Sequence, residues 1–238
     1  MTDFTYEYYR DLLKRLSERG YEFRSFGAVS DGKTVFLRHD VDWSPRRALE
    51  MAQLESDLGI SSTYFFHLTS PLYNPLHDRS REILTEIESY GHEIGVHLST
   101  HQYWDDDPGP EAVSKKVTSE RAILSHLVDA VADATSFHIP PDWVLDVEYD
   151  DFTNTYEPRY FSEITYLADS NQRWREERPL ESDLSDQVQM LVHPGLWAET
   201  DQQFVERLAH EQESRSAYVS AYIDEQYLPD NETISEAN

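Results

Sequence analysis

The sequence has no cysteine, no long apolar run and few positive charges. The absence of cysteine among the 238 residues excludes disulfides and thiolate metal sites, whereas histidine and carboxylate ligands remain possible. No run of about 18 apolar residues occurs, so we expect no membrane-spanning helix. The first residues, MTDFTYEYYRDLLKRL, lack the basic and apolar segments of a secretory signal, and we therefore predict a cytoplasmic protein.

The deficit of positive charge is the strongest signal in the composition. Lysine and arginine number 20 against 46 acidic residues, which gives a formal net charge of −26. A compact chain with this charge repels itself, but at molar salt the screening length falls to roughly 3 Å and the repulsion is largely removed. The acids are spread from Asp3 to Glu236, which favours adaptation to high salt over the alternative of an acidic protein with a basic partner. Without a basic stripe, nucleic-acid binding is not expected.

Apolar and β-branched runs alternate with helical patterns along the chain. This alternation predicts an α/β fold in which crossover helices join parallel strands. The length fits a single domain over residues 1–238, with an N-terminal helix within 1–20 and a frayed tail at 229–238. Strands are expected at TVFLRHDV, STYFFHL, HEIGVHL, TSFHI, EITYLAD and QVQMLVH, and further helices near 45–59, 80–91, 111–128 and 201–225.

Several predicted strands end in side chains that are able to do chemistry. In α/β barrels and open α/β sheets, ligands bind at the carboxyl ends of the parallel strands. We therefore expect one shared site built from these strand ends, which are His39–Asp40, His97, His138, Asp169 and His193.

The segment HLSTH places His97 and His101 four residues apart. If a helix begins here, both imidazoles face the same side and can reach one metal ion. Zinc proteases with this spacing carry a glutamate base directly after the first histidine, whereas this chain has Leu98, so that class is not indicated. Taken alone, two histidines at this spacing are more often solvated or structural than a pair of metal ligands.

The segment RHDVDW places Asp40 and Asp42 at the end of a buried strand. One interpretation is a turn in which Asp42 caps the helix that follows. The other divides the two roles, so that one carboxylate binds a metal and the other takes a proton from water.

Five segments, in this order, resemble those of polysaccharide deacetylase-like proteins, the NodB-homology or carbohydrate esterase family 4 group: TVFLRHDVDW, STYFFHL, SYGHEIGVHLSTH, SFHIPP and QVQMLVHPGLW. The resemblance covers roughly residues 34–197. It implies a distorted (β/α)-barrel of about seven parallel strands, related to the TIM barrel. It also implies a metal-dependent hydrolase that removes an N-acyl group, acetyl or formyl, from a sugar or glycan precursor.

The resemblance implies roles for nine residues. They are Asp40 as base, His193 as acid, Asp169 as the carboxylate that orients His193, Asp42, His97 and His101 as metal ligands, and His138, Trp174 and Trp197 as substrate-binding residues. The expected cofactor is a divalent metal, Zn²⁺ first, while iron, cobalt, nickel and manganese are chemically admissible. The expected substrate is an N-acylated sugar, a nucleotide sugar or a lipid-linked glycan.

The segment SFHIPP departs from the family pattern. His138 stands where the family has an arginine that holds the base, and Pro141 has no N–H where a backbone N–H usually helps to bind the oxyanion. Two other functions stay open. One is a sugar-nucleotide transferase in which Asp40 and Asp42 form a D-x-D motif, and the other is a barrel that binds metal and glycan without turnover.

Overall fold

The computed structural model describes residues 3–28, 31–181, 183–229 and 232–234. The chain divides into two compact units, the first ending at Asp201 and the second beginning at Gln202. The single domain over 1–238 stays a prediction. Of the tail expected at 229–238, positions 230–231 and 235–238 lie outside the described residues.

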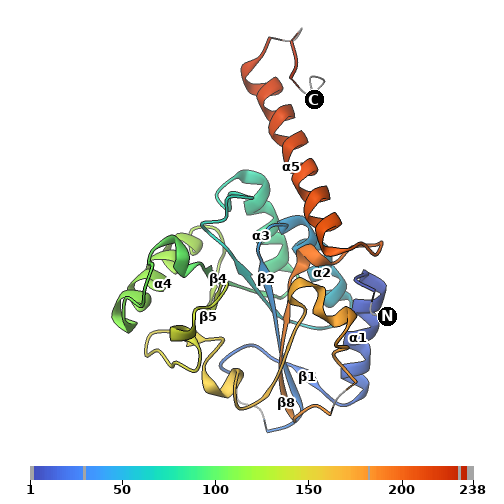
Figure 1. The fold of residues 1–238 in the computed structure, drawn as a ribbon, viewed down its shortest axis with the longest axis vertical. Helices are drawn as coiled ribbons and strands as arrows, with labels where there is room; N and C mark the ends of the chain where they lie inside the picture. The colour runs from blue at the N-terminus through green and yellow to red at the C-terminus, as the bar shows by residue number, and fades with distance from the viewer. Residues whose placement is uncertain (1–2, 29–30, 182, 230–231, 235–238) are drawn as a thin grey trace. The chain divides into compact units, whose positions relative to one another are not determined.

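The first unit is built on a parallel sheet that curls into a distorted half-barrel (Figure 1). The strands are β1 (Glu22–Phe23), β2 (Thr34–Val41), β3 (Thr63–Phe66), β4 (Glu93–Leu98), β5 (Val131–Phe137), β6 (Thr153–Asn154), β7 (Thr165–Ala168) and β8 (Gln187–Val192). Their order is β6-β5-β4-β3-β2-β8-β7, with β1 paired to β2, and every pair is parallel. This confirms the predicted (β/α)-barrel class.

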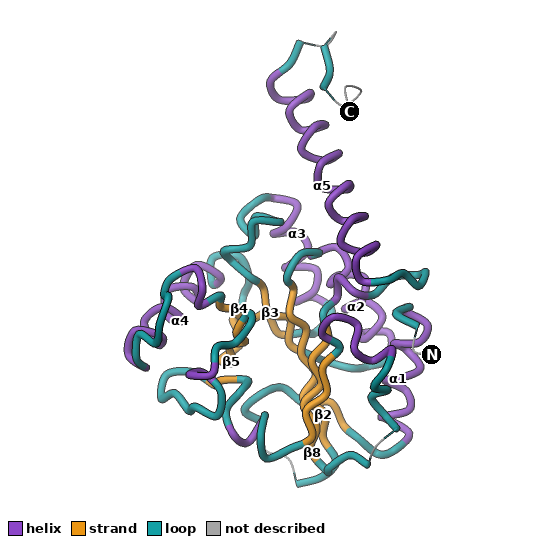
Figure 2. Tube along the Cα trace, viewed as in Figure 1, coloured by secondary structure: helices purple, strands orange, loops and turns teal. Residues whose placement is uncertain are grey.

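Helices of the first unit lie around the outside of the strands (Figure 2). The α-helices are α1 (Tyr6–Glu18), α2 (Pro45–Asp57), α3 (Asp78–Ser89), α4 (Pro110–Leu124) and, in the second unit, α5 (Phe204–Tyr227). The 3₁₀ helices are η1 (Thr100–Gln102), η2 (Asp142–Val144), η3 (Pro158–Tyr160), η4 (Ser170–Arg175) and η5 (Pro194–Leu196). No helix in the described part of the chain combines the length and apolar character needed to cross a lipid bilayer.

Strand β2 coincides with the predicted segment TVFLRHDV, and all of its residues are buried. Helices cover its outer face while the barrel interior covers its inner face, as is usual for parallel strands. Successive side chains alternate between these faces. His39 therefore meets α2 on the outer face, whereas Arg38 and Asp40 face the interior.

The barrel interior is lined by aromatic rings on the amino-terminal side of Arg38. Phe36 of β2 contacts the rings of Phe26 and Tyr160, and Phe26 also contacts Phe65 of β3. Gly95 of β4 makes room for this packing, because a Cβ at that position would lie 2.6 Å from the Phe65 ring. This aromatic packing lies below Arg38 and Gln189, and the candidate site lies above them at the carboxyl end of the sheet.

A buried carboxylate, Glu55 of α2, ties the helices to the outer face of the sheet. Tyr9 and Ser62 donate hydrogen bonds to it at 2.5 and 2.6 Å. The Nε2 atom of His39 lies 2.7 Å from Glu55 Oε1, and His92 Nδ1 lies 3.7 Å from Oε2. Burial alone would raise the pKa of Glu55, but its contacts with His39, His92 and Ser62 hold the pKa below the ordinary value of 4.5.

Candidate metal centre and active site

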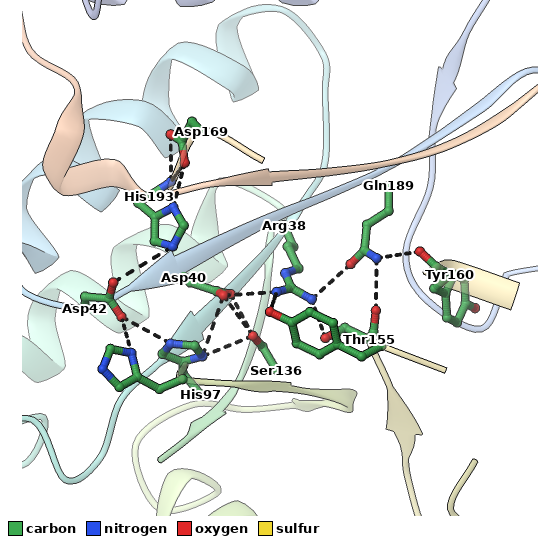
Figure 3. A network of polar contacts seen from close by, with 12 residues as sticks. Arg38, Asp40, Asp42, His97, Ser136, Thr155, Tyr160, Asp169, Gln189 and His193 are labelled. Carbon is green, nitrogen blue, oxygen red and sulfur yellow. Dashed lines mark hydrogen bonds and ion pairs between the residues drawn. The ribbon is translucent and has the colours of Figure 1, made fainter. Parts of the chain in front are cut away.

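The chemistry-bearing strand ends meet at one edge of the sheet. Asp40 and Asp42 lie at the end of β2, His97 near the end of β4, His138 directly after β5 and His193 directly after β8. These strands are close neighbours in the sheet order, so their carboxyl ends open onto the same space. Figure 3 shows Asp42 between His97 and His193, with Asp40 on the side of Arg38.

Asp42 is the centre of a group of metal-ligating atoms. Its Oδ1 lies 3.1 Å from His97 Nε2 and 3.0 Å from His138 Nδ1. One ligand atom from each of these three residues falls within 4.8 Å of the other two. Burial alone would raise the pKa of Asp42, but the neighbouring imidazoles of His138, His97 and His193 hold that pKa well below its usual range. The carboxylate is therefore ionised and available to a cation.

The hydrogen bonds of His97 define its tautomer. Ser136 Oγ has one proton and donates it to the Asp40 carboxylate, 2.9 Å away. The 3.0 Å contact between Ser136 Oγ and His97 Nδ1 is then a bond in which Nδ1–H donates. In the neutral imidazole this leaves a lone pair on Nε2, the atom that faces Asp42.

A lone pair facing a carboxylate oxygen is repulsive unless a positive charge sits between them. A divalent cation fulfils this condition, and one carboxylate with two imidazoles is a ligand set that suits zinc and other divalent metals. The Ser136 contact is the kind of second hydrogen bond that orients a metal-binding histidine. The side chains of Asp42, His97 and His138 therefore fit a divalent metal ion.

The structure places His101 apart from this group. His97 lies in β4, but the chain leaves the strand at Ser99, and His101 lies in the short helix η1. The helical rule that joins residues four apart does not apply across this boundary. His101 is exposed and its Nε2 lies 2.9 Å from the carbonyl oxygen of Ile139. Its role as a ligand stays a prediction.

His138 occupies the place beside Asp42, although the sequence indicated only a substrate contact for it. Burial lowers the pKa of His138, but its hydrogen bond with Asp42 raises it overall. The following residue, Ile139, has a φ of 46°, a left-handed conformation that is unusual for a β-branched residue. In the sequence, the position of His138 at a strand end was the signal that could have marked it as a ligand.

Asp40 is separated from the metal group by its own partners. It is 2 % exposed, it accepts two contacts of 2.9 Å from Ser136, and Arg38 Nη2 lies 3.2 Å from its Oδ2. Asp40 and Asp42 thus have different surroundings. This division favours a base and a ligand over a joint D-x-D clamp.

His193 and Asp169 form a second pair on the opposite side of Asp42. Asp169 is fully buried and its Oδ1 lies 2.6 Å from His193 Nδ1. Burial would lower the pKa of His193, but the charge and hydrogen bond of Asp169 raise it to about 9. Its other ring nitrogen, Nε2, lies 4.0 Å from Asp42 Oδ2, so a protonated nitrogen faces the site.

The two predicted substrate-binding tryptophans lie in the core. Trp197 is 0 % exposed, and its indole N–H donates to Asp169 Oδ2 at 2.8 Å. Trp174 is 2 % exposed and packs edge-on against Trp197. Their contact with substrate stays a prediction, while the geometry gives Trp197 a part in holding Asp169.

Two further residues border the site that the sequence did not assign to it. His67 lies with its ring 4.9 Å from that of His138 and 5.8 Å from that of His97. Burial and these two histidines lower the pKa of His67 to about 4, so it is neutral. Trp43 packs over Gly195, where a Cβ would lie 1.8 Å from the indole nitrogen. Because Gly195 has no side chain, the Trp43 indole can pack directly against the backbone that follows His193.

No model of a known protein family matches the chain, and no curated protein matches it either. Among solved structures, the chain is similar to a peptidoglycan N-acetylglucosamine deacetylase, with 13 % identity over 85 % of this chain and 90 % of the other and a TM-score of 0.46. It is similar to an acetyl xylan esterase of family 4 from Clostridium thermocellum in complex with cobalt, with 14 % identity over 82 % and 92 % and a TM-score of 0.41.

A third similar structure is a family 4 pseudoenzyme from Bacillus anthracis, with 12 % identity over 79 % of this chain and 62 % of the other and a TM-score of 0.43. Similarity at this level assigns no role to a residue, so the roles here rest on the geometry of this chain. The solved structures to which the chain is similar are carbohydrate esterases of family 4, the group that the sequence motifs resemble.

Proposed function

We propose that the protein is a metal-dependent hydrolase that removes an acetyl or formyl group from the nitrogen of a sugar or glycan precursor. The observation that carries the proposal is the arrangement around Asp42. A candidate metal group is flanked by a buried carboxylate, Asp40, and by an imidazole, His193, whose pKa is raised to about 9. Metal-assisted amide hydrolysis uses these three functions, which are a Lewis acid, a base and a proton donor.

Asp42 and His97 would hold the metal, with His138 as third ligand in the observed arrangement and His101 as the ligand implied by the motif. When bound, the ion polarises the acyl carbonyl and makes a water molecule more acidic. Zinc is the metal that we propose, because two imidazoles and one carboxylate leave an open position in a tetrahedral site.

Asp40 accepts a proton from the attacking water, whose oxygen adds to the acyl carbon. Arg38 and Ser136 keep this carboxylate in place during the transfer. His193 is protonated at neutral pH and donates its Nε2 proton to the departing nitrogen as the C–N bond breaks. Asp169 stabilises the imidazolium until that proton leaves. The products are a free amine and a carboxylic acid.

We propose a nucleotide-linked or lipid-linked sugar precursor as substrate, in the cytoplasm of a salt-adapted cell. The net charge of −26, spread over the whole chain, supports the salt adaptation. Fractionation of the source cells tests the location, and recovery of the protein outside the membrane would contradict it.

The function is tested with protein purified at high salt, loaded with zinc and offered a panel of N-acetyl and N-formyl sugars, nucleotide sugars and lipid-linked sugars. Release of acetate or formate is measured for the natural protein and for Asp40→Asn and His193→Gln. We expect turnover that falls by about 100-fold or more in each variant, since acid–base catalysis contributes about that much. Metal should stay bound in Asp40→Asn.

Two outcomes contradict the proposal. Turnover that is unchanged in Asp40→Asn would exclude the assigned base. Stoichiometric metal without turnover on any member of the panel would indicate a barrel that binds metal and glycan but does not hydrolyse.

A further inference from the structure

Arg38 is a fully buried arginine on the same strand as Asp40, two positions earlier. Residues two apart on a strand share a face, so both side chains point into the barrel. Arg38 Nη2 donates to Asp40 Oδ2 at 3.2 Å. A buried guanidinium requires a charged partner, and Asp40 supplies that charge from within β2.

The other partners of the Arg38 guanidinium are neutral. Tyr156 accepts from Nη2 at 2.6 Å, and Gln189 Oε1 accepts from Nη1 at 3.0 Å. Thr155 accepts a further bond from Nη1. These partners belong to β8 and to the segment directly after β6, so the guanidinium is fixed from two directions besides its own strand.

The orientation of Gln189 shows that this pocket is built for a donor. Its Nε2 donates to the carbonyl oxygens of Thr155 and Tyr160, at 2.9 and 2.6 Å. Its Oε1 is therefore turned toward Arg38, as Figure 3 shows. The ring of Tyr156 also lies 4.5 Å from the guanidinium carbon, a distance at which a cation and an aromatic face attract.

Asp40 is also held by Ser136 of β5, whose hydroxyl lies 2.9 Å from both carboxylate oxygens and donates its one proton to the carboxylate. The guanidinium on one side and the hydroxyl on the other restrict the rotation of the carboxylate. His138 stands where the family that this sequence resembles has an arginine, but its ring contacts Asp42 and not Asp40. Another positively charged side chain must therefore hold Asp40 in place.

We propose that Arg38 is the positioning residue for the base Asp40, supplied from the base's own strand. This inference rests on the proposed function, in which Asp40 accepts the proton. In this proposal Arg38 acts through Asp40, and its hydrogen bonds go to Asp40, Thr155, Tyr156 and Gln189. Its removal should therefore affect the chemical step while leaving substrate affinity and metal binding intact.

The test compares Arg38→Met, Arg38→Lys and a matched control, Glu55→Gln, which removes a buried charge of α2 that contacts His39 on the opposite face of β2. For Arg38→Met we expect kcat to fall about 100-fold, the effect of a misplacement of about 1 Å. KM should stay within about twofold of the natural value. Metal stoichiometry should be unchanged.

Arg38→Lys keeps the positive charge but loses the planar fork that binds Thr155, Gln189 and Tyr156. We expect its kcat to lie between those of the natural protein and Arg38→Met. Glu55→Gln should lose stability but keep its kcat. A merely structural role of Arg38 would instead predict that kcat follows stability across all three variants.

A crystal structure of Arg38→Met provides a readout that needs no activity. We expect the Asp40 carboxylate to have turned away from Ser136. Retention of both 2.9 Å contacts overturns the proposal, as does a kcat near the natural value. If the natural protein is inactive on every substrate, the proposed function fails, and the position of Asp40 in this variant still decides the role of Arg38.

Discussion

The identity of the third metal ligand can be decided by comparing His138→Ala with His101→Ala. Two imidazole nitrogens lie 3.0 and 3.1 Å from the same oxygen of Asp42, and they belong to His138 and His97. His101 instead contacts a backbone carbonyl and is exposed. We therefore predict that His138→Ala loses metal affinity and that His101→Ala largely keeps it.

The expected magnitude follows from the position of the ligand. Loss of a residue that only supports a ligand lowers metal affinity by about 10- to 100-fold. Loss of a ligand itself should cost at least the upper value, which corresponds to about 2.7 kcal/mol of binding free energy. For His101→Ala we expect a change below about 10-fold, because it removes one exposed hydrogen bond.

The assay is competition between the metal-free protein and a chelator at high salt, with zinc and cobalt. His126→Ala serves as the matched control, since it removes an exposed histidine outside the site. A strong loss of affinity in His101→Ala together with normal affinity in His138→Ala would refute the geometric assignment. The motif-derived ligand would then be correct.

Three further predictions address other parts of the molecule. Asp169→Asn removes the carboxylate that holds the pKa of His193 at about 9. The kcat should fall by about 10²- to 10⁴-fold, and the alkaline limb of the pH profile should move toward neutral pH. An alkaline limb that does not move would contradict the pairing of His193 with Asp169. Glu55→Gln should lower the free energy of unfolding by about 3 kcal/mol, measured by urea denaturation. Because the folded pKa of Glu55 lies below 4.5, its contribution is present above that pH and is lost as the pH falls, so the variant should lose less stability than the natural protein between neutral and acidic pH. The net charge of −26 predicts that the melting temperature rises between 0.1 and 2 M salt, by about 2 to 4 °C for each kcal/mol of repulsion removed, and a flat or falling melting curve would refute the salt adaptation.

The barrel strands could be predicted from the sequence because their side chains repeat with a clear pattern between turn signals. The segment TVFLRHDV coincides with β2, and QVQMLV coincides with β8. The strands β1 and β6 were not predicted, because two residues each are too few to show a periodicity. Their pairing depends on neighbours that only the folded chain supplies.

The sequence could predict those site residues that lie at the ends of strands, because these ends meet at one edge of the sheet. Asp40, Asp42, His97 and His193 were indicated in this way, and the structure brings them together. The prediction that His101 lies beside His97 depended on a helix beginning at His97, whereas β4 continues to Leu98. The burial of Trp197 could not be predicted either. Its indole donates to the buried carboxylate of Asp169, and the local sequence does not distinguish such a tryptophan from one that faces a ligand.

Arg38 and His138 lie next to different aspartates of β2, Arg38 beside Asp40 and His138 beside Asp42. His138 faces Asp42 and adds an imidazole to the candidate metal group, so it does not provide a positive charge for Asp40, the base in our proposal. An uncompensated carboxylate at 2 % exposure would be costly, because a buried charge needs a charged partner. Arg38 supplies that partner from β2, and its own burial is stabilised because Thr155, Tyr156 and Gln189 accept hydrogen bonds from its two Nη atoms, while its Nε atom has no hydrogen-bond partner among the described residues. The two residues should therefore depend on each other: restoring an arginine at 138 in an Arg38→Met background should bring back part of the lost kcat, but at the expense of metal affinity.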